Sequence, residues 1–101
     1  MEDIVGKLRE VEGSESDPKM KELARFAIEF HNENKNYPSL NLAFVKIIGV
    51  FQEEVVSGIM YSMQFHALDV DELKVLLCSA GVLVKEDNSK EADYLLVITQ
   101  V

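Results

Sequence analysis

The chain has 101 residues, enough for one domain with a single hydrophobic core. Its net charge of −8, from 10 basic and 18 acidic residues, argues against nucleic acid and against an anionic membrane as partners. The single cysteine, Cys78, rules out an internal disulfide, and no Cys/His cluster has metal-ligand spacing. No run of about 18 apolar residues is present, so the sequence predicts no membrane-spanning segment.

The N-terminal segment, residues 1–16, is predicted to be a flexible arm that forms a short strand near Leu8 to Val11. Its first ten residues include three acidic residues and no apolar stretch of the kind found in signal peptides. We therefore expect an intracellular protein, with secretion of a processed form as the alternative. No linker or internal repeat is visible, so residues 1–101 are expected to form a single domain.

A helix is predicted to begin at Pro18, with Asp17 as its N-cap. Apolar residues then recur at intervals of three and four, which places them on one stripe of a helix: Leu23, Phe26, Ala27 and Phe30. Asparagines and a proline between positions 32 and 38 mark the end of this helix. His31 has no partner motif, so a surface or capping histidine is expected rather than a catalytic or metal-binding one.

Four strands are predicted after the helix. Their expected ranges are Leu42 to Glu53, Gly58 to Leu68, Leu73 to Lys85 and Tyr94 to Val101. The second strand alternates cleanly between two faces, which predicts that Tyr61, Met63 and Phe65 pack against the helix stripe. One helix followed by consecutive antiparallel strands indicates an α+β domain, with the helix on one face of the sheet.

Polar runs separate the later strands. The acidic run over residues 69–72 lacks the glycine and the distal glutamate of an EF-hand calcium loop, so a solvated turn is expected. Residues 86–93 are strongly polar and are predicted to form the next turn. Neither run predicts a metal site.

The stretch from Glu54 to Gly58, with the sequence Glu-Val-Val-Ser-Gly, joins the first two predicted strands and is interpreted as a hairpin tip. Two valines at such a tip would be in water, and Gly58 would supply the backbone freedom of a tight turn. An apolar tip on rigid strands suits insertion into a partner's groove. Periodicity alone favours another interpretation, in which Val55 and Val56 belong to a strand and the turn lies elsewhere.

The sequence contains no recognisable enzyme motif. It has no nucleophile elbow, no phosphate-binding loop and no paired His and Cys at a motif spacing. Cys78 is predicted to be a small buried strand residue rather than a reactive thiol. We therefore expect a protein that is not an enzyme and that uses no cofactor.

Three segments resemble the plant cystatins. Residues 23–32, Leu-Ala-Arg-Phe-Ala-Ile-Glu-Phe-His-Asn, are similar to the helix signature of that family. Val55 to Gly58 resembles the end of its Gln-Val-Val-x-Gly hairpin motif, and Ala80 to Lys85 is similar to the strand before its second loop. The resemblance covers nearly the whole chain and implies a four- or five-stranded antiparallel sheet wrapped around one α-helix.

The resemblance also implies an activity, the reversible and non-covalent inhibition of papain-like cysteine proteases. In that family, an N-terminal arm with glycine, a first hairpin, and a second hairpin carrying Pro-Trp form a wedge that fills the active-site cleft. The protease-binding residues implied here are Val5, Gly6, Gln52, Glu54, Val55, Val56, Ser57, Gly58, Glu86 and Asp87.

All three parts of the wedge differ from the family pattern. The Gly-Gly pair reads Gly6-Lys7, and the motif glutamine is replaced by Glu54, with Gln52 two residues earlier. The Pro-Trp position falls on Glu86-Asp87, and the chain has no tryptophan. These departures leave a second function open, a cystatin-fold binding module that recognises another protein without inhibiting a protease. A monomer is expected, with a domain-swapped dimer as the alternative.

Overall fold

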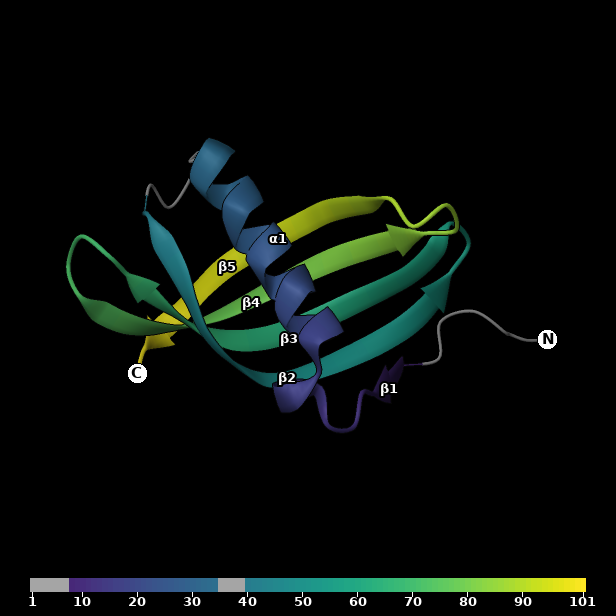
Figure 1. Cartoon of the computed structure of the whole chain (residues 1–101), viewed down its shortest axis with the longest axis horizontal. Coiled ribbons are helices and arrows are strands. Elements are labelled where there is room, and N and C mark those ends of the chain that lie inside the picture. Colours follow the sequence, from purple (N-terminus) through teal and green to yellow (C-terminus); the bar gives the residue numbers. More distant parts are fainter. Residues whose placement is uncertain (1–7, 35–39) are drawn as a thin grey trace.

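The computed structural model describes residues 8–34 and 40–101. The elements in chain order are β1 (Leu8–Glu10), η1 (Ser14–Ser16), α1 (Pro18–Asn34), β2 (Leu42–Val55), β3 (Gly58–Asp69), β4 (Lys74–Lys85) and β5 (Lys90–Gln100). The strands form one antiparallel sheet in the order β1 to β5, and α1 lies across one face of it (Figure 1).

Both ends of α1 are fixed by side chains. At the start, Asp17 Oδ1 accepts a hydrogen bond of 2.9 Å from the backbone N–H of Lys19, and Pro18 opens the helix as predicted. At the far end, the Asn32 amide donates to the carbonyl of Leu42 at 2.9 Å and accepts from its N–H at 3.0 Å. Because Leu42 begins β2, this pair anchors the helix to the sheet.

The buried face of α1 is rotated relative to the predicted stripe. Leu23 and Ala27 are buried as expected, but Phe26 is only partly buried and Phe30 is 47% exposed. The residues that face the sheet are Met20, Leu23, Ala24, Ala27, Ile28 and His31. The prediction for Phe30 was therefore wrong, because two neighbouring stripes share Leu23 and Ala27, and the other one faces the sheet. Among the described residues, no helix is long and apolar enough to cross a membrane.

His31 is buried rather than at the surface, which corrects the sequence-based expectation. Its Nε2 lies 3.1 Å from the carbonyl oxygen of Leu40. Since a carbonyl oxygen only accepts, Nε2–H is the donor, and this bond offsets the cost of burying the imidazole. His31 therefore helps to hold the end of the helix against the chain that enters β2.

The sheet contributes its helix-facing side to the core. Tyr61, Met63 and Phe65 on β3 are buried, as the alternation predicted. Their register partners on β4 are smaller: Val82, Ala80 and Cys78. This pairing of large and small side chains leaves room for α1 to pack closely on the sheet.

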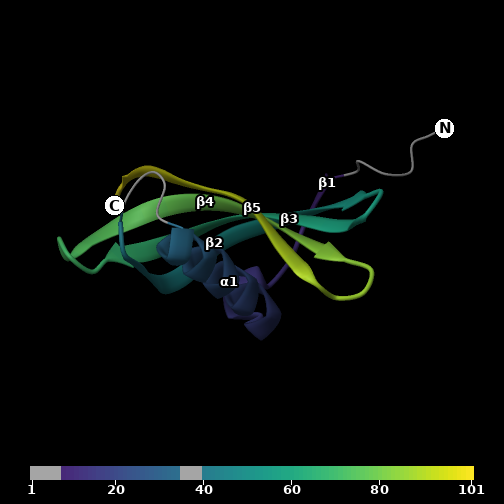
Figure 2. The ribbon, with the colours of Figure 1, turned by 90° about the horizontal axis from the view of Figure 1, so that it is seen from above.

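The N-terminal part of the described chain adds a fifth strand at the sheet edge. Leu8 to Glu10 pair with Glu53 to Phe51 of β2, and the N–H of Val11 donates to the carbonyl of Val50 at 2.8 Å. This agrees with the strand expected near Leu8 to Val11. Seen from above, the whole sheet is strongly twisted, with α1 on one side of it (Figure 2).

Candidate partner-binding site

Two hairpin turns lie at the same end of the sheet (Figure 1). The first turn, Val56-Ser57, joins β2 to β3, and the second, residues 86–89, joins β4 to β5. Gly58 pairs with Val55 on one side and with Lys85, the last residue of β4, on the other. The two tips are therefore neighbours, one strand apart, and they diverge when the molecule is seen from above (Figure 2).

The first tip is narrower than the sequence predicted. Glu54 and Val55 are the last residues of β2, and only Val56 and Ser57 form the turn. Val56 is 90% exposed at the apex, whereas Val55 is half-buried. The turn does lie within Glu54 to Gly58, as the hairpin interpretation predicted, and Val56 is exposed to water. The alternative was correct for Val55, which belongs to a strand, but wrong for Val56 and for the place of the turn.

Gly58 is required by the close approach of β4. A Cβ at this position would overlap the carbonyl oxygen of Val84 and lie 2.9 Å from Cα of Lys85, and both are backbone atoms. Among the described residues, positive φ angles occur at Leu73, Asn88 and two glycines, so neither Val56 nor Ser57 needs one. Gly58 itself has a φ of +156°, which residues with a side chain rarely adopt, so the predicted need for backbone freedom is confirmed. The structure adds a second role: Gly58 seats the first hairpin against the strand that carries the second tip.

The second tip is held in shape by its own side chains. Asp87 Oδ1 accepts hydrogen bonds from the Ser89 hydroxyl at 2.6 Å and from the Ser89 N–H at 3.0 Å. These bonds hold the pKa of the Asp87 carboxyl below its ordinary value. Asn88 adopts a φ of +70°, and its N–H donates to the carbonyl of Lys85 at 2.9 Å. Glu86 and Asp87 are thus the two central residues of a tight turn.

The second turn is shorter than predicted, because β5 begins at Lys90 and not near Tyr94. Sequence reasoning selected Glu86 and Asp87 but missed Asn88 and Ser89, which fix the conformation of this tip. The signal was present, since Asp-Asn-Ser is a run of residues that favour turns and local side-chain hydrogen bonds.

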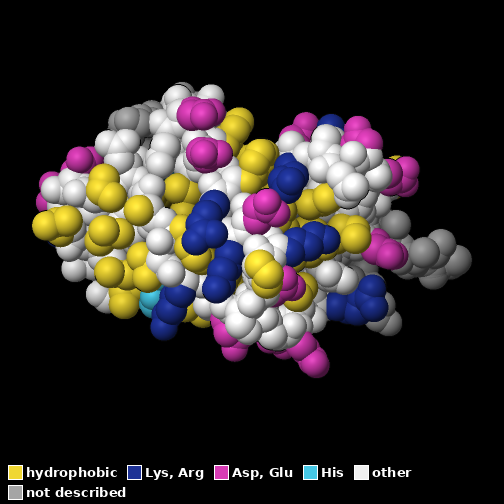
Figure 3. Space-filling view, in the orientation of Figure 1, with side chains coloured by type: hydrophobic (Ala, Val, Ile, Leu, Met, Phe, Trp, Pro, Cys, Tyr) yellow, Lys and Arg dark blue, Asp and Glu magenta, His cyan; other side chains and the backbone are white. Residues whose placement is uncertain are grey.

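The charges around the two tips are mainly acidic (Figure 3). Glu54 and Glu86 are exposed, one at the base of the first tip and one at the apex of the second. Lys85 and Glu91 form an exposed ion pair with an Nζ–Oε2 distance of 3.5 Å. A partner that covers this end must therefore leave the exposed carboxylates in water or provide hydrogen-bond donors for them.

Gln52, another predicted site residue, does not join the tips. Gln52 stands opposite Tyr61 in the β2–β3 register, and it is half-buried. Val5 and Gly6 lie outside the described residues. The structure thus brings Glu54 to Gly58 together with Glu86 and Asp87, and it places Gln52 in the strand behind them.

The described residues provide neither a metal-binding cluster nor an exposed thiol. No group of three or more His, Cys, Asp and Glu side chains within them could hold a metal ion. Cys78 is fully buried, as predicted, and burial raises the pKa of its thiol to about 11.

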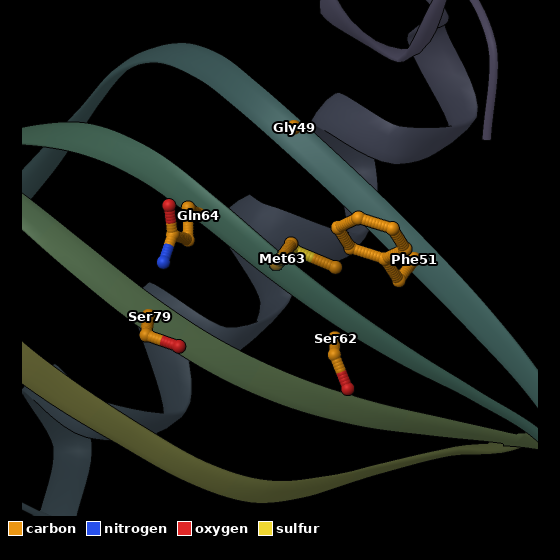
Figure 4. Close-up of a pocket in the computed structure, with 6 residues that line it drawn as sticks. All are labelled: Gly49, Phe51, Ser62, Met63, Gln64 and Ser79. Atoms are coloured by element: carbon orange, nitrogen blue, oxygen red, sulfur yellow. The ribbon is translucent and has the colours of Figure 1, made fainter. Parts of the chain in front are cut away.

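A shallow hollow of about 200 Å³ lies on the sheet face away from α1 (Figure 4). It is lined by uncharged residues: Gly49, Phe51, Ser62, Met63, Gln64 and Ser79.

Comparison with known proteins identifies the family. The sequence model of the Cystatin domain family matches residues 6–96. The chain belongs to the cystatin family. It is 33% identical over 82 residues to Multicystatin of Solanum tuberosum, across 81% of this chain and 10% of that protein. It is 34% identical over 71 residues to Cysteine proteinase inhibitor 3 of Arabidopsis thaliana, across 70% of this chain and 54% of that protein. The cystatin thus spans about half the length, or less, of these curated relatives.

Structural comparison supports the same fold. A crystal structure described as that of Al-CPI matches with a TM-score of 0.68, covering 92% of this cystatin and 100% of the other chain at 18% identity. The predicted α+β cystatin fold, five antiparallel strands and one helix, is confirmed. Both curated relatives are plant proteins, which agrees with the plant-type resemblance. The Arabidopsis relative is named as a cysteine proteinase inhibitor and not as an enzyme, which agrees with the sequence-based expectation.

Proposed function

We propose that this cystatin is a reversible, non-covalent inhibitor of papain-like cysteine proteases, and that its first tip enters the active-site cleft. The observation that carries the proposal is Val56, which stands 90% exposed at the apex of a rigid hairpin in a member of the cystatin family. The name of the Arabidopsis relative, Cysteine proteinase inhibitor 3, supports the same class of partner.

Inhibition of this kind needs a rigid apolar projection and no bond-making group. Val56 would leave water on docking, which contributes roughly 1.5–3 kcal/mol if the side chain becomes fully buried. The turn has only two residues between paired strands, so the tip loses little conformational entropy when it binds. Ser57 and Gly58 add little bulk, which lets the hairpin backbone approach the walls of a narrow cleft.

The second tip would meet the protease beside the first. Oδ1 of Asp87 is occupied by Ser89 of its own turn, which leaves one oxygen of this carboxylate for a partner, whereas the exposed Glu86 can offer both of its oxygens. Burying an unpaired carboxylate is unfavourable. We therefore place Glu86 at the rim of the cleft, in water or beside a basic residue of the protease.

A second candidate function is the binding of another protein without protease inhibition. One observation favours it: the apex of the second tip carries two carboxyl groups and no large apolar side chain. Aromatic anchors supply much of the binding energy in protein interfaces, and this tip lacks one.

The decisive experiment is a titration of papain with the cystatin, following hydrolysis of a small chromogenic substrate. We expect progressive loss of papain activity and its full recovery on dilution. Binding should persist when the papain active-site thiol is blocked with a small methylthio group, because no bond to it is made. If papain stays fully active with a large excess of folded cystatin, the inhibitor proposal is wrong and the second function is favoured.

A further inference from the structure

The end of the sheet opposite the two tips carries an exposed loop, residues 70–73, between β3 and β4, with two apolar and two acidic side chains (Figure 1). Leu73 is 76% exposed and Val70 is 42% exposed. Val101, 64% exposed, lies at the same end, where its N–H donates to the carbonyl of Val75 at 2.8 Å. Apolar side chains gather at this end of the molecule (Figure 3).

The backbone holds Leu73 in an unfavourable conformation. Its φ is +60°, in the left-handed region that glycine and asparagine enter most easily. Its N–H donates to the carbonyl of Asp69 at 2.7 Å, which closes the loop. The buried carboxylate of Asp69 accepts from the N–H groups of Asp71 and Glu72 at 3.1 and 3.2 Å. The loop is thus firmly built, and it presents a leucine to water at a position that suits glycine better.

Charges of opposite sign flank Leu73. Asp71 and Glu72 precede it and Lys74 follows it, and all three are exposed. Asp71 Oδ2 accepts a hydrogen bond of 3.2 Å from the Asn41 amide of the same chain. If a two-fold axis related Leu73 of one copy to Leu73 of another, Glu72 of each copy would stand opposite Lys74 of the other. Glu72 and Lys74 are therefore complementary in charge across such an axis, with an apolar residue at the centre, whereas Asp71 is bonded to Asn41 of its own copy.

We propose that residues 70–74 form a contact surface for a second copy of this chain, in a weak two-fold dimer centred on Leu73. One loop is small beside the roughly 1,200 Å² that specific, stable interfaces bury in total, so we expect a dissociation constant on the order of 100 µM. The two tips lie at the opposite end of each copy, so the dimer would leave both candidate partner-binding sites free and pointing apart.

The first test is sedimentation equilibrium of the parent chain and of Leu73→Gly. The weight-average mass of the parent should rise as the protein concentration increases from about 10 to about 500 µM. Salt of about 0.5 M should reduce this rise, because it screens the charge pairs. Leu73→Gly should weaken association at least 10-fold while raising Tm by about 2–5 °C, because glycine tolerates the positive φ. A purely structural role for Leu73 would not produce these opposite effects.

The matched control for Leu73→Gly is Leu96→Ser on β5, which removes another leucine that is 58% exposed. It should leave association unchanged. A parent chain that stays monomeric throughout this range would overturn the proposal. Association that survives Leu73→Gly, or that is lost equally in Leu96→Ser, would also overturn it.

A charge exchange tests the two-fold arrangement. Glu72→Lys and Lys74→Glu should each lose self-association, since each places like charges opposite one another. A mixture of these two variants should associate at least as well as the parent, and so should the chain that carries both substitutions. If neither the mixture nor the double variant associates, the two-fold contact is wrong. Papain inhibition does not enter this experiment, so its outcome is independent of the proposed function.

Discussion

The two tips at one end of the sheet keep their shape in different ways. Within the described residues, no side-chain hydrogen bond supports the first turn, Val56-Ser57, which depends on the paired strands beneath it. The second turn is stabilised internally, by two hydrogen bonds from Ser89 to Asp87. A tip shaped by its strands leaves its side chains free for a partner. A tip shaped by its own side chains has fewer of them to offer.

Gly58 links the two tips, since it lies between the end of β2 and the end of β4. The contrast therefore predicts three kinds of effect. Changes at the first apex should alter binding alone, changes at Gly58 should alter binding and stability, and changes within the second turn should act mainly on that turn.

The largest effect is expected from Val56→Asp, which should weaken papain inhibition about 100-fold or more. The substitution removes roughly 1.5–3 kcal/mol of apolar burial and brings a carboxylate into the cleft. Because Val56 is 90% exposed in the free protein, Tm should change little. Inhibition constants and thermal melts of the two proteins test this.

Two further variants sharpen that result. The pair Val55→Asp with Val56→Asp should abolish binding, but it should also cost some stability, because Val55 is half-buried in β2. Glu54→Gln is the control and should keep or improve binding, since it removes an exposed charge beside the apex. Equal inhibition by Val56→Asp and the parent would show that the first tip is not the contact.

The next effect in size is expected from Gly58→Ala, which should lower stability and inhibition together. The new methyl group would meet the backbone of Val84 and Lys85, so β3 or β4 must shift. Overpacking of this kind costs about 1–3 kcal/mol, which corresponds to a fall in Tm of roughly 5–15 °C in a domain of this size. Ser57→Ala is the control and should melt near the parent. An unchanged Tm in Gly58→Ala would show that the close packing of Gly58 on β4 does not couple the two tips.

A smaller effect, opposite in sign, is expected at the second tip. Glu86→Pro fits the second position of the turn and removes a carboxylate from its apex. Asp87→Trp adds an aromatic side chain but loses both hydrogen bonds from Ser89. We expect the two substitutions together to tighten papain binding about 10-fold. A tryptophan anchor can contribute about 2 kcal/mol or more to binding, and the loss of turn rigidity offsets part of that gain. Unchanged or weaker binding would show that this tip does not enter the cleft.

Much of the fold follows from local patterns. The alternation along β3 correctly predicted the burial of Tyr61, Met63 and Phe65, and the cap at Asp17 correctly predicted the start of α1. The rotation of α1 was not predicted, because a second apolar stripe at helical spacing competes with the predicted one: Met20, Leu23, Ala24, Ala27 and Ile28. His31 continues this second stripe, and its burial depends on the carbonyl of Leu40, nine residues away. A polar residue is left out of an apolar stripe when its partner is unknown.

The candidate site was predictable only where it depends on residues that are neighbours in the sequence. The apolar first tip is visible in sequence, because a hairpin needs only neighbouring strands. The need for backbone freedom at Gly58 is visible too, but its close approach to β4 is not. The atoms that a side chain there would meet belong to Val84 and Lys85, which come close only through the β3–β4 register. The orientation of Asp87 towards Ser89 likewise depends on the turn conformation. That any of these residues contact a protease stays a prediction.

The smallest effect concerns the protonation of Asp87, and it tests whether the second tip is self-supporting. The Ser89 hydroxyl, then the Ser89 N–H, lower the carboxyl pKa from its ordinary value of 3.8. Well above pH 3.8 the carboxylate is ionised in both the folded and unfolded states, so its stabilising contribution is fully present. That contribution is lost as the pH falls below 3.8 through the lowered pKa. Because Asp87 is exposed, Tm should barely respond, and the measurement must be local.

Titration of the Asp87 carboxyl carbon by NMR provides that measurement. The parent should show a midpoint below 3.8, and Ser89→Ala should move the midpoint upward, because the hydroxyl donor is removed while the backbone N–H stays. Asp87→Asn should abolish the pH-dependent shift of the Ser89 amide signal. A parent midpoint at or above 3.8 would mean that the Ser89 bonds do not hold the carboxylate in solution. Glu86 and Asp87 would then both be free for a partner, and the distinction between the two tips would disappear.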